Sequence, residues 1–283
     1  MPEATSTKLD IEKIVNDVLG TIDREREREI IARRFGLFDR KETLEQIGEL
    51  LGITRERVRQ LEKAVVLRLK AQAEQAQLPH ISATQDKFSK VIGDSGKVSR
   101  VTDLSAQMTT KNSPLDQARI SFLATLCPEL VVIEDNDHYH QAVGLKDEHN
   151  EKKIKDLVDK LVEAIAKLGQ PARIEKISAA SGLTASHTKA LASVSKNLAT
   201  LNDHWGLMKW PMVNPKNIRD KIYVILHQKN QHMHFNDIAE AIKDSSFKRK
   251  DVTTQAIHNE LIKDKRFVLI GRGIYALKEW GYD

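Results

Sequence analysis

Residues 43–69 read TLEQIGELLGITRERVRQLEKAVVLRL, and this stretch decides the fold of the N-terminal part of the chain. Thr43 and Gln46 form a capping-box pattern, in which each side chain satisfies the other residue's free backbone amide, so we expect a helix to begin directly after Thr43. Gly52 can adopt the left-handed conformation that ends a helix, and Thr54 is a natural N-cap for the next one. Two helices joined by so short a turn predict a helix-turn-helix.

The second helix of this pair has two unlike faces. At 100° per residue, the apolar side chains fall on one stripe, which consists of Val58, Leu61, Val65 and Leu69. The opposite face consists of Glu56, Gln60 and Lys63, with Arg55 and Arg59 beside them. These residue types suit a major groove, because they can hydrogen-bond base edges or phosphates. The alternative is a solvated helix face, since neighbouring Arg and Glu also stabilise a helix through ion pairs.

The stretches REREREIIARRFGL and TLEQIGELLGITRERVRQLEKAVVLRLK resemble region four of the sigma-seventy family, the part of a bacterial sigma factor that recognises the −35 promoter element. The resemblance covers Ile22 to Lys70. It implies base contacts from Arg55, Glu56, Gln60 and Lys63, and phosphate contacts from Arg26, Arg34, Arg57 and Arg59. Only residues 1–21 precede it, and nothing in them resembles region two, so we expect the chain not to be a complete sigma factor.

Composition places the chain among ordinary soluble proteins. It has 283 residues, of which 40% are hydrophobic, and one cysteine, Cys127, which excludes an intramolecular disulfide and a Cys-based zinc site. No apolar run approaches a membrane span, and the N-terminus lacks a signal-peptide pattern, so we expect a cytoplasmic, nucleoid-associated protein with no membrane partner. The formal charge of +5 is compatible with nucleic acid. The excess of positive charge is concentrated toward the C-terminus, since residues 213–283 contain 13 Lys and Arg against 9 Asp and Glu.

The predicted fold is mainly α, with the helix-turn-helix unit followed by tandem winged-helix domains that have small β-hairpin wings. The polar run AQAEQAQLPHIS indicates a boundary near Leu78 to Ser82. Helix patterns followed by a hairpin pattern recur three times after it. The resulting domains are an N-terminal helix over 1–20, the helix-turn-helix unit over 21–75, and winged helices over 83–146, 151–213 and 215–283.

Two of these hairpins align without a gap, which indicates an internal repeat. Trp205 to Trp210, reading WGLMKW, matches Tyr275 to Trp280, reading YALKEW. The last unit, with HNELIKDKRFVLIGRGIYALKEWGY, resembles the HARE-type helix-turn-helix of the bacterial RNA polymerase delta subunit and of chromatin and restriction proteins. The resemblance implies a winged helix but does not decide between DNA and polymerase as its partner.

Candidate contacts in the last domain lie before its third helix, on that helix and at the wing tip. They are Lys248, Arg249, Lys250, His258, Asn259 and Arg272. Such positions in winged helices often meet phosphates. The alternative for the run SSFKRKD is a solvated loop. For the aromatic residues of the wings, Trp205, Trp210, Tyr275 and Trp280, we expect packing between wing and helix, and the alternative is base stacking.

Enzyme chemistry has no candidate residues in the sequence. Histidines occur at 138, 140, 227, 232 and 234, but without HExxH spacing or a carboxylate cluster. No Walker loop, dinucleotide fingerprint or nucleophile elbow is found. We therefore expect a protein that is not an enzyme and that has no metal and no cofactor.

The sequence predicts a bacterial DNA-binding transcription protein, sigma-factor-like or associated with RNA polymerase, that binds double-stranded promoter DNA and core polymerase. One alternative is a polymerase accessory or scaffold subunit whose helix-turn-helix domains bind protein. Another is a nucleoid or restriction-associated DNA binder. The sequence leaves the target sequence, the sign of regulation and the oligomeric state open.

Overall fold

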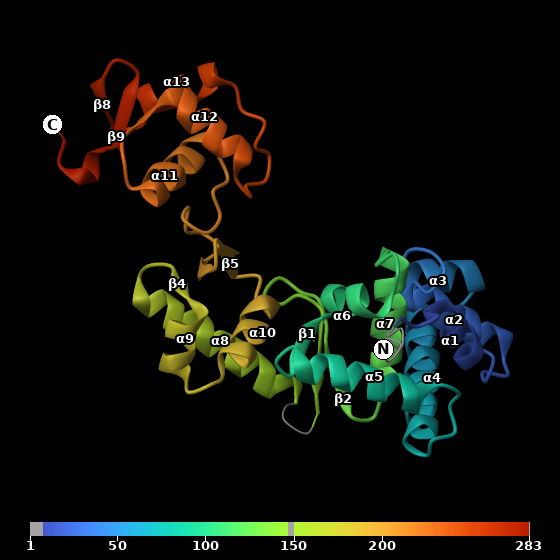
Figure 1. Cartoon of the computed structure of the whole chain (residues 1–283). Helices are drawn as coiled ribbons and strands as arrows, with labels where there is room; N and C mark the ends of the chain where they lie inside the picture. Colours follow the sequence, from blue (N-terminus) through green and yellow to red (C-terminus); the bar gives the residue numbers. More distant parts are fainter. Residues whose placement is uncertain (1–7, 147–149, 283) are drawn as a thin grey trace, which may run out of the picture. The chain divides into compact units, whose positions relative to one another are not determined.

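The computed structural model describes residues 8–146 and 150–282 (Figure 1). Within these ranges the chain is mostly helical, with three small antiparallel sheets, as the sequence predicted. By its contacts the chain divides into two compact units. The first consists of Met1–Leu161 and Leu183–Ser195, and the second of Val162–Gly182 and Lys196–Asp283.

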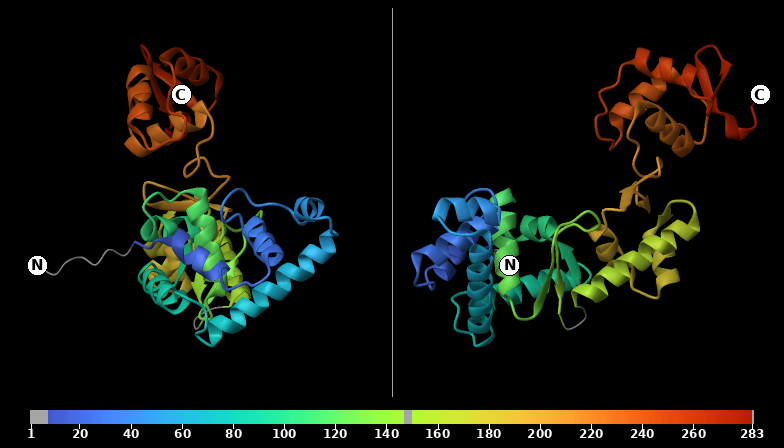
Figure 2. Two further views of the ribbon diagram at one scale, coloured as in Figure 1. Left: turned by 90° about the vertical axis from the view of Figure 1, so that its right-hand side faces the viewer. Right: turned by 180° about the vertical axis from the view of Figure 1, so that it is seen from behind.

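The first four helices form the helix-turn-helix unit and its N-terminal support. They are α1 (Ile11–Leu19), α2 (Glu25–Phe35), α3 (Leu44–Leu51) and α4 (Arg55–Glu74). The predicted capping box is confirmed, because the Thr43 amide donates to Gln46 Oε1 at 2.9 Å and the Gln46 amide donates to Thr43 Oγ1 at 3.1 Å. Gly52 ends α3 with a φ of 66°, and Thr54 caps α4. Beyond the turn, α4 continues as one long helix (Figure 2).

The rest of the chain repeats one order of elements three times, namely helix, short strand, two helices and a hairpin. The first repeat is α5 (Ile81–Asp94), β1 (Val98–Arg100), α6 (Val101–Met108), α7 (Pro114–Leu126), β2 (Leu130–Ile133) and β3 (Ala142–Leu145). The second is α8 (Glu151–Leu168), β4 (Ala172–Arg173), α9 (Ile174–Ser181), α10 (Ala185–Val194), β5 (Leu198–Leu201) and β6 (His204–Leu207). The third is α11 (Ile218–Lys229), β7 (Met233–His234), α12 (Phe235–Asp244), α13 (Thr254–Lys263), β8 (Phe267–Gly271) and β9 (Ile274–Leu277), with a 3₁₀ turn at Lys278–Trp280.

The strand register confirms the repeat that the hairpins indicated. In every sheet the last strand lies between the other two. Trp205 pairs with Ala172, the first residue of β4, and Tyr275 pairs with Met233, the first residue of β7, so the two aromatic residues occupy equivalent positions. The short strands β1, β4 and β7 were not predicted, because two or three residues are too few to show a period of two.

One hydrophobic core joins the helix-turn-helix unit to the first winged helix. It extends from Ile11 on α1 through Leu69 on α4 to Phe122 on α7 and Val143 on β3. Residues 74–77 are exposed, but Leu78 and Ile81 belong to this core. The predicted polar boundary at 78–82 is therefore wrong for these two residues, because both side chains are buried against the same core as their neighbours.

Helix α7 is the element that holds the two parts together. Almost all of its side chains are at least half-buried, because α1, α2 and α4 cover one side of it while α5, α6 and β2 cover the other. Arg119 on α7 is only 6% exposed, and its Nε donates to the main-chain oxygen of Leu37 at 2.8 Å. Its guanidinium also lies over the ring of Phe38, 5.6 Å from the centroid. The loop after α2 is thereby fixed to the winged helix.

Candidate nucleic-acid interface

The turn between α3 and α4 depends on a close approach of backbone to backbone. A Cβ on Gly48 would lie 2.7 Å from the main-chain oxygen of Ile53, so only glycine fits at this position of α3. The sequence interpretation used Gly52 and missed Gly48. The available signal was a glycine inside an otherwise amphipathic helix, which often marks a close packing contact.

A small core fixes the rotation of α4. Ile30, Ile47 and Val58, one from each helix, are fully buried together, and Leu51 and Leu61 pack partly against them. Farther along α4, Val65 and Leu69 of the predicted apolar stripe belong to the larger core that α4 shares with α1 and α7. Because these apolar contacts face α2 and α3, the opposite face of α4 must face solvent.

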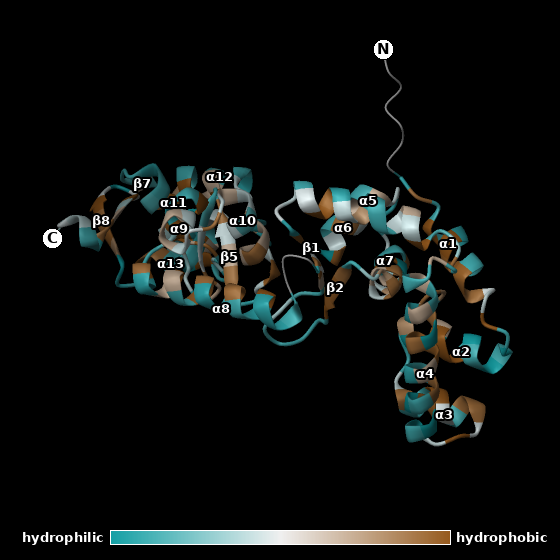
Figure 3. Ribbon diagram, turned by 90° about the horizontal axis from the view of Figure 1, so that it is seen from below, coloured by the Kyte–Doolittle hydropathy of each residue, from teal (hydrophilic) through white to brown (hydrophobic). Residues whose placement is uncertain are grey.

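The predicted DNA-contacting residues of α4 lie together on its outward face. All six are exposed, namely Arg55, Glu56, Arg57, Arg59, Gln60 and Lys63. Figure 3 shows hydrophilic residues at the end of α4 that lies beside α3. The sequence-predicted grouping is therefore present, with its members spread over the first three turns of the helix.

Four of these side chains pair with one another. Arg59 donates to both carboxylate oxygens of Glu56, from Nε at 2.9 Å and from Nη2 at 2.7 Å. Gln60 Nε2 donates to Glu56 at 3.4 Å, and Arg57 Nη1 donates to Gln60 Oε1 at 3.4 Å. The hydrogen bonds from Arg59 lower the pKa of Glu56, and Glu56 in turn raises the pKa of Arg59. This surface is therefore preordered by charge-assisted hydrogen bonds that a base or phosphate would have to replace.

The two arginines predicted outside α4 also make intramolecular contacts. Arg26 is exposed, and its Nη2 donates to the main-chain oxygen of Leu51 at 2.7 Å, which caps the C-terminal end of α3. Arg34 is half-buried, and it donates to Glu62 Oε2 at 3.2 Å and to the main-chain oxygen of Glu42 at 3.3 Å. Arg34 thus ties α2 to α4, a role that the sequence interpretation did not include.

The predicted residues of the last winged helix fall into two groups. Lys248, Arg249 and Arg272 are exposed, and so is Lys250, whose Nζ donates to the main-chain oxygen of Ser245 at 3.0 Å. His258 is half-buried between Phe235 and Tyr275, with ring centroids 5.0 and 6.2 Å away. It is therefore a packing residue on the flank of α13.

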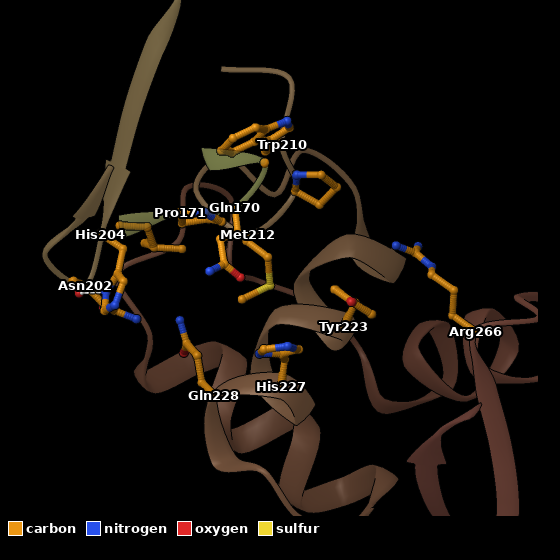
Figure 4. A pocket seen from close by; sticks show the side chains of 13 residues that line it. Gln170, Pro171, Asn202, His204, Trp210, Met212, Tyr223, His227, Gln228 and Arg266 are labelled. Atoms are coloured by element: carbon orange, nitrogen blue, oxygen red, sulfur yellow. Dashed lines mark hydrogen bonds between the residues drawn. The ribbon is translucent and has the colours of Figure 1, made fainter. Parts of the chain in front are cut away.

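A cavity of about 760 Å³ lies in the second unit, and Figure 4 shows the side chains around it. Trp210, Met212, Tyr223 and His227 are among its lining residues. Arg266 also lines it, stacks on Tyr223 at 5.1 Å, and is held by Asp264 and Asp220. The lining is aromatic, apolar and amide in character, and its arginine is already paired, so the cavity offers no free charge to a ligand.

Over the described ranges, none of the helices is both long enough and apolar enough to cross a bilayer.

This geometry defines a helix-turn-helix with an outward-facing polar second helix, and comparison with known proteins shows what this part of the chain is similar to. Residues 24–71 match the family model described as Sigma-70, region 4. The chain is 47% identical to RNA polymerase sigma factor sigB of Arabidopsis thaliana over 62 residues, which are 22% of this chain and 10% of that protein.

Two bacterial relatives match the same part of the chain. RNA polymerase sigma factor SigA of Bacillus sp is 46% identical over 57 residues, which are 20% of this chain and 15% of that protein. RNA polymerase principal sigma factor HrdD of Streptomyces griseus is 40% identical over 73 residues, which are 25% of this chain and 22% of that protein. The chain thus spans only a tenth to about a fifth of the length of these relatives. The HARE-type resemblance of residues 215–283 stays a prediction.

Proposed function

We propose that this protein is a sigma-factor-like or RNA-polymerase-associated transcription regulator that binds promoter-type DNA through α4. The observation that supports this most is the outward face of α4. Buried Val58 and Val65 set its rotation, so that Arg55, Glu56, Gln60 and Lys63 all point away from the core. Recognition helices of this kind contact base edges with their N-terminal turns, which is where these residues lie.

Each side chain on this face has a distinct hydrogen-bonding capacity. Gln60 has both a donor and an acceptor and can pair with adenine, whereas Arg55 and Lys63 can donate to guanine. Glu56 can accept from the amino group of cytosine. Since base edges differ in donors and acceptors, this mixture can discriminate between sequences, which a uniformly basic surface cannot do.

The phosphate contacts are assigned to arginines around this face. Arg57 and Arg59 lie on α4 itself, and Arg26 lies on the neighbouring helix with donors left over after its bond to Leu51. Arg34 offers a phosphate only the donors that Glu62 and Glu42 leave unused. Each such contact releases counterions from DNA, so binding should weaken as salt rises.

The polymerase contact is assigned to the second half of α4. Leu67 is 57% exposed and lies beside Phe35 and Val66 in a groove of about 340 Å³, flanked by Lys63 and Lys70. Leu67 is seven residues beyond Gln60, about 10 Å along the helix. Arg59 and Lys63 line this groove as well as the face assigned to DNA, so polymerase and DNA would meet at these two side chains. An exposed apolar groove with a polar rim is typical of a protein-binding surface.

The proposal is tested with the full chain, because the helix-turn-helix shares its core with the first winged helix. Gln60→Ala should cost about 1–3 kcal/mol on a duplex selected from a random pool and leave a scrambled duplex unaffected, because only a base contact is lost. Gln77→Ala, an exposed glutamine after α4, is the matched control. Equal weakening on both duplexes, or no preference by the wild type, would show that α4 does not recognise sequence.

The polymerase assignment has its own test. Leu67→Glu should weaken binding to purified core RNA polymerase at least about tenfold, because a charge in an apolar contact is costly. DNA affinity should stay close to that of the wild type. Leu50→Glu on α3, where the leucine is 55% exposed, is the control. If Leu50→Glu alone weakened polymerase binding, the contact would lie on α3.

A second function is a scaffold or accessory subunit whose helix-turn-helix domains bind protein. The observation in its favour is α7, the third helix of a winged helix, which packs against other helices and a strand of this chain along almost its whole length. If the full chain bound core polymerase but showed no sequence preference on DNA, this second function would be the better one.

A further inference from the structure

The three winged helices differ in how much of their third helix is accessible. In α7 only Pro114 is exposed, and in α10 only Ser186 and Lys189 are exposed. In α13 the pattern is reversed, because only Ile257 and Leu261 are buried. In a winged helix the third helix is the second helix of the helix-turn-helix, the one that enters the major groove, so this difference bears directly on function.

Packing within the chain accounts for the first two cases. Helix α7 is enclosed by the helix-turn-helix unit, through contacts such as that of Arg119 with Leu37. Helix α10 packs against β1, and a Cβ on Gly96 would collide with the main chain of Ser186. Neither helix can therefore enter a DNA groove in the folded protein.

The outward face of α13 has the composition of a DNA-contacting surface. Opposite the buried stripe, at 100° per residue, lie Gln255, Asn259, Ile262 and Lys263, all of them exposed. Gln255 Nε2 donates to Asn259 Oδ1 at 3.1 Å, so the two amides lie side by side. Amides of this kind can pair with adenine, and an exposed isoleucine can contact a thymine methyl group.

Exposed cations lie in two other segments of the same domain. Lys248 and Arg249 precede α13, and Arg272 lies in the turn between β8 and β9, where Gly273 has a φ of 71°. The buried ammonium of Lys221 donates to the main-chain oxygen of Arg249 at 2.8 Å and thereby holds the loop in place. Two of the nearby carboxylates are paired, Glu260 with Arg219 and Asp264 with Arg266, whereas Asp251 is an exposed carboxylate directly after Lys250.

The hairpin of the first winged helix has the opposite charge. Glu134 and Asp137 are exposed in its turn, where the last hairpin has Arg272. An acidic wing repels phosphate, whereas a basic wing tip can bind it. The last winged helix is therefore the one of the three whose accessible helix and wing charge both suit DNA.

We propose that α13 and the β8–β9 hairpin form a second surface for duplex DNA, separate from α4. Gln255 and Asn259 face the base edges, and Lys248, Arg249 and Arg272 bind phosphates. This proposal does not rest on the one made for α4, since it uses different residues, a different helix and a different core.

The test uses the full chain and a labelled duplex of random sequence, titrated at several salt concentrations. The triple variant Lys248→Ala, Arg249→Ala, Arg272→Ala should reduce the slope of log affinity against log salt by about 2–3, because three phosphate contacts are lost. The triple variant Lys216→Ala, Lys229→Ala, Lys243→Ala removes the same charge from exposed positions outside this surface and should retain nearly the full slope.

Asn259→Ala provides a second readout that a merely electrostatic surface would not give. The substitution is made in a chain that already contains Gln60→Ala on α4. It should leave the slope of log affinity against log salt unchanged and should change which duplexes the full chain selects from a random pool. If the first triple variant kept the wild-type slope and affinity, the surface would not bind DNA, and exposed Ile262 would then indicate protein docking. Failure of the α4 proposal would appear instead in the single variant Gln60→Ala, which would then prefer the selected duplex over the scrambled one as strongly as the wild type does.

Discussion

Arg119 on α7 donates a hydrogen bond of 2.8 Å to the main-chain oxygen of Leu37, a residue 82 positions earlier in the chain. The bond joins the loop after α2 to the third helix of a winged helix. Both partners are buried, and Arg119 also approaches Glu12 on α1 at 3.5 Å. The helix-turn-helix unit is thus held by a helix that in other winged helices is available to DNA.

Replacing Arg119 should destabilise this junction. Arg119→Ala leaves the oxygen of Leu37 buried without its donor, which should cost about 1–3 kcal/mol of unfolding free energy. Urea denaturation followed by circular dichroism measures the change, and Arg28→Ala at an exposed position is the control. Equal midpoints for Arg119→Ala and the wild type would mean that the bond does not hold the two parts together.

The helix-turn-helix unit should not be stable when separated from the first winged helix. A fragment of residues 1–80 would expose Val15, Val65 and Leu69, which are buried in the shared core. It should therefore melt at lower temperature or aggregate, whereas residues 1–146 should unfold cooperatively. The prediction is tested by comparing the melting temperature and the cooperativity of unfolding of the two fragments. A cooperative transition of 1–80 at the temperature of 1–146 would contradict the shared core.

Gly48→Ala should destabilise the helix-turn-helix. The added Cβ meets the main-chain oxygen of Ile53, which cannot move away as a flexible side chain could, so we expect a loss of about 1–3 kcal/mol. Gly93→Ala is the matched change, since that glycine lies in α5 with its nearest neighbour at 4.0 Å. It should stabilise the protein by at most about 1 kcal/mol through helix propensity. Similar effects at the two positions would refute the close approach at Gly48.

Glu56→Gln should strengthen non-specific DNA binding. The carboxylate both repels phosphates and holds Arg59, so its removal frees a cation on the same face. At about 6 Å in water one charge pair is worth about 0.7 kcal/mol, or roughly threefold in affinity. Titration should show this gain on a scrambled duplex, and a smaller gain or none on the selected duplex, where the proposed contact of Glu56 with cytosine is weakened. Glu25→Gln at the start of α2 is the control, and weaker binding by Glu56→Gln to both duplexes would contradict the expected repulsion.

Lys221 should make the stability of the last winged helix depend on pH in the alkaline range. Burial lowers its pKa in the folded state below the ordinary 10.5, so between the two values the unfolded chain binds more protons. The contribution of Lys221 to the free energy of unfolding therefore rises with pH between these two pKa values. Below both values this contribution is constant and unfavourable. The melting temperature of the wild type relative to Lys221→Met should increase from pH 8 toward about 10.5. A constant difference would show that Lys221 titrates as in the unfolded chain.

Local sequence signals determined the helix-turn-helix and the repeat. Capping at Thr43 and Thr54, the left-handed Gly52 and the apolar stripe of α4 depend on residues within one or two turns, so they could be predicted without tertiary contacts. The repeat was visible because equivalent strand positions require similar side chains, as Trp205 and Tyr275 show. The outward face of α4 followed from the same stripe, since a buried face determines its opposite, whereas the assignment of its residues to DNA came from the resemblance to region four of the sigma-seventy family.

Only the tertiary structure decided which helices remain accessible. The amphipathic pattern of α7 does not reveal that a second set of helices covers it, because burial on both sides depends on partners far away in sequence, such as Leu37 for Arg119. Arg34 pairs with Glu62, and Arg26 donates to the main-chain oxygen of Leu51. Neither contact can be predicted from the sequence, because the partners lie far apart in the chain. Sequence periodicity specifies which face of a helix is apolar, but which neighbours cover the remaining faces is determined by long-range packing.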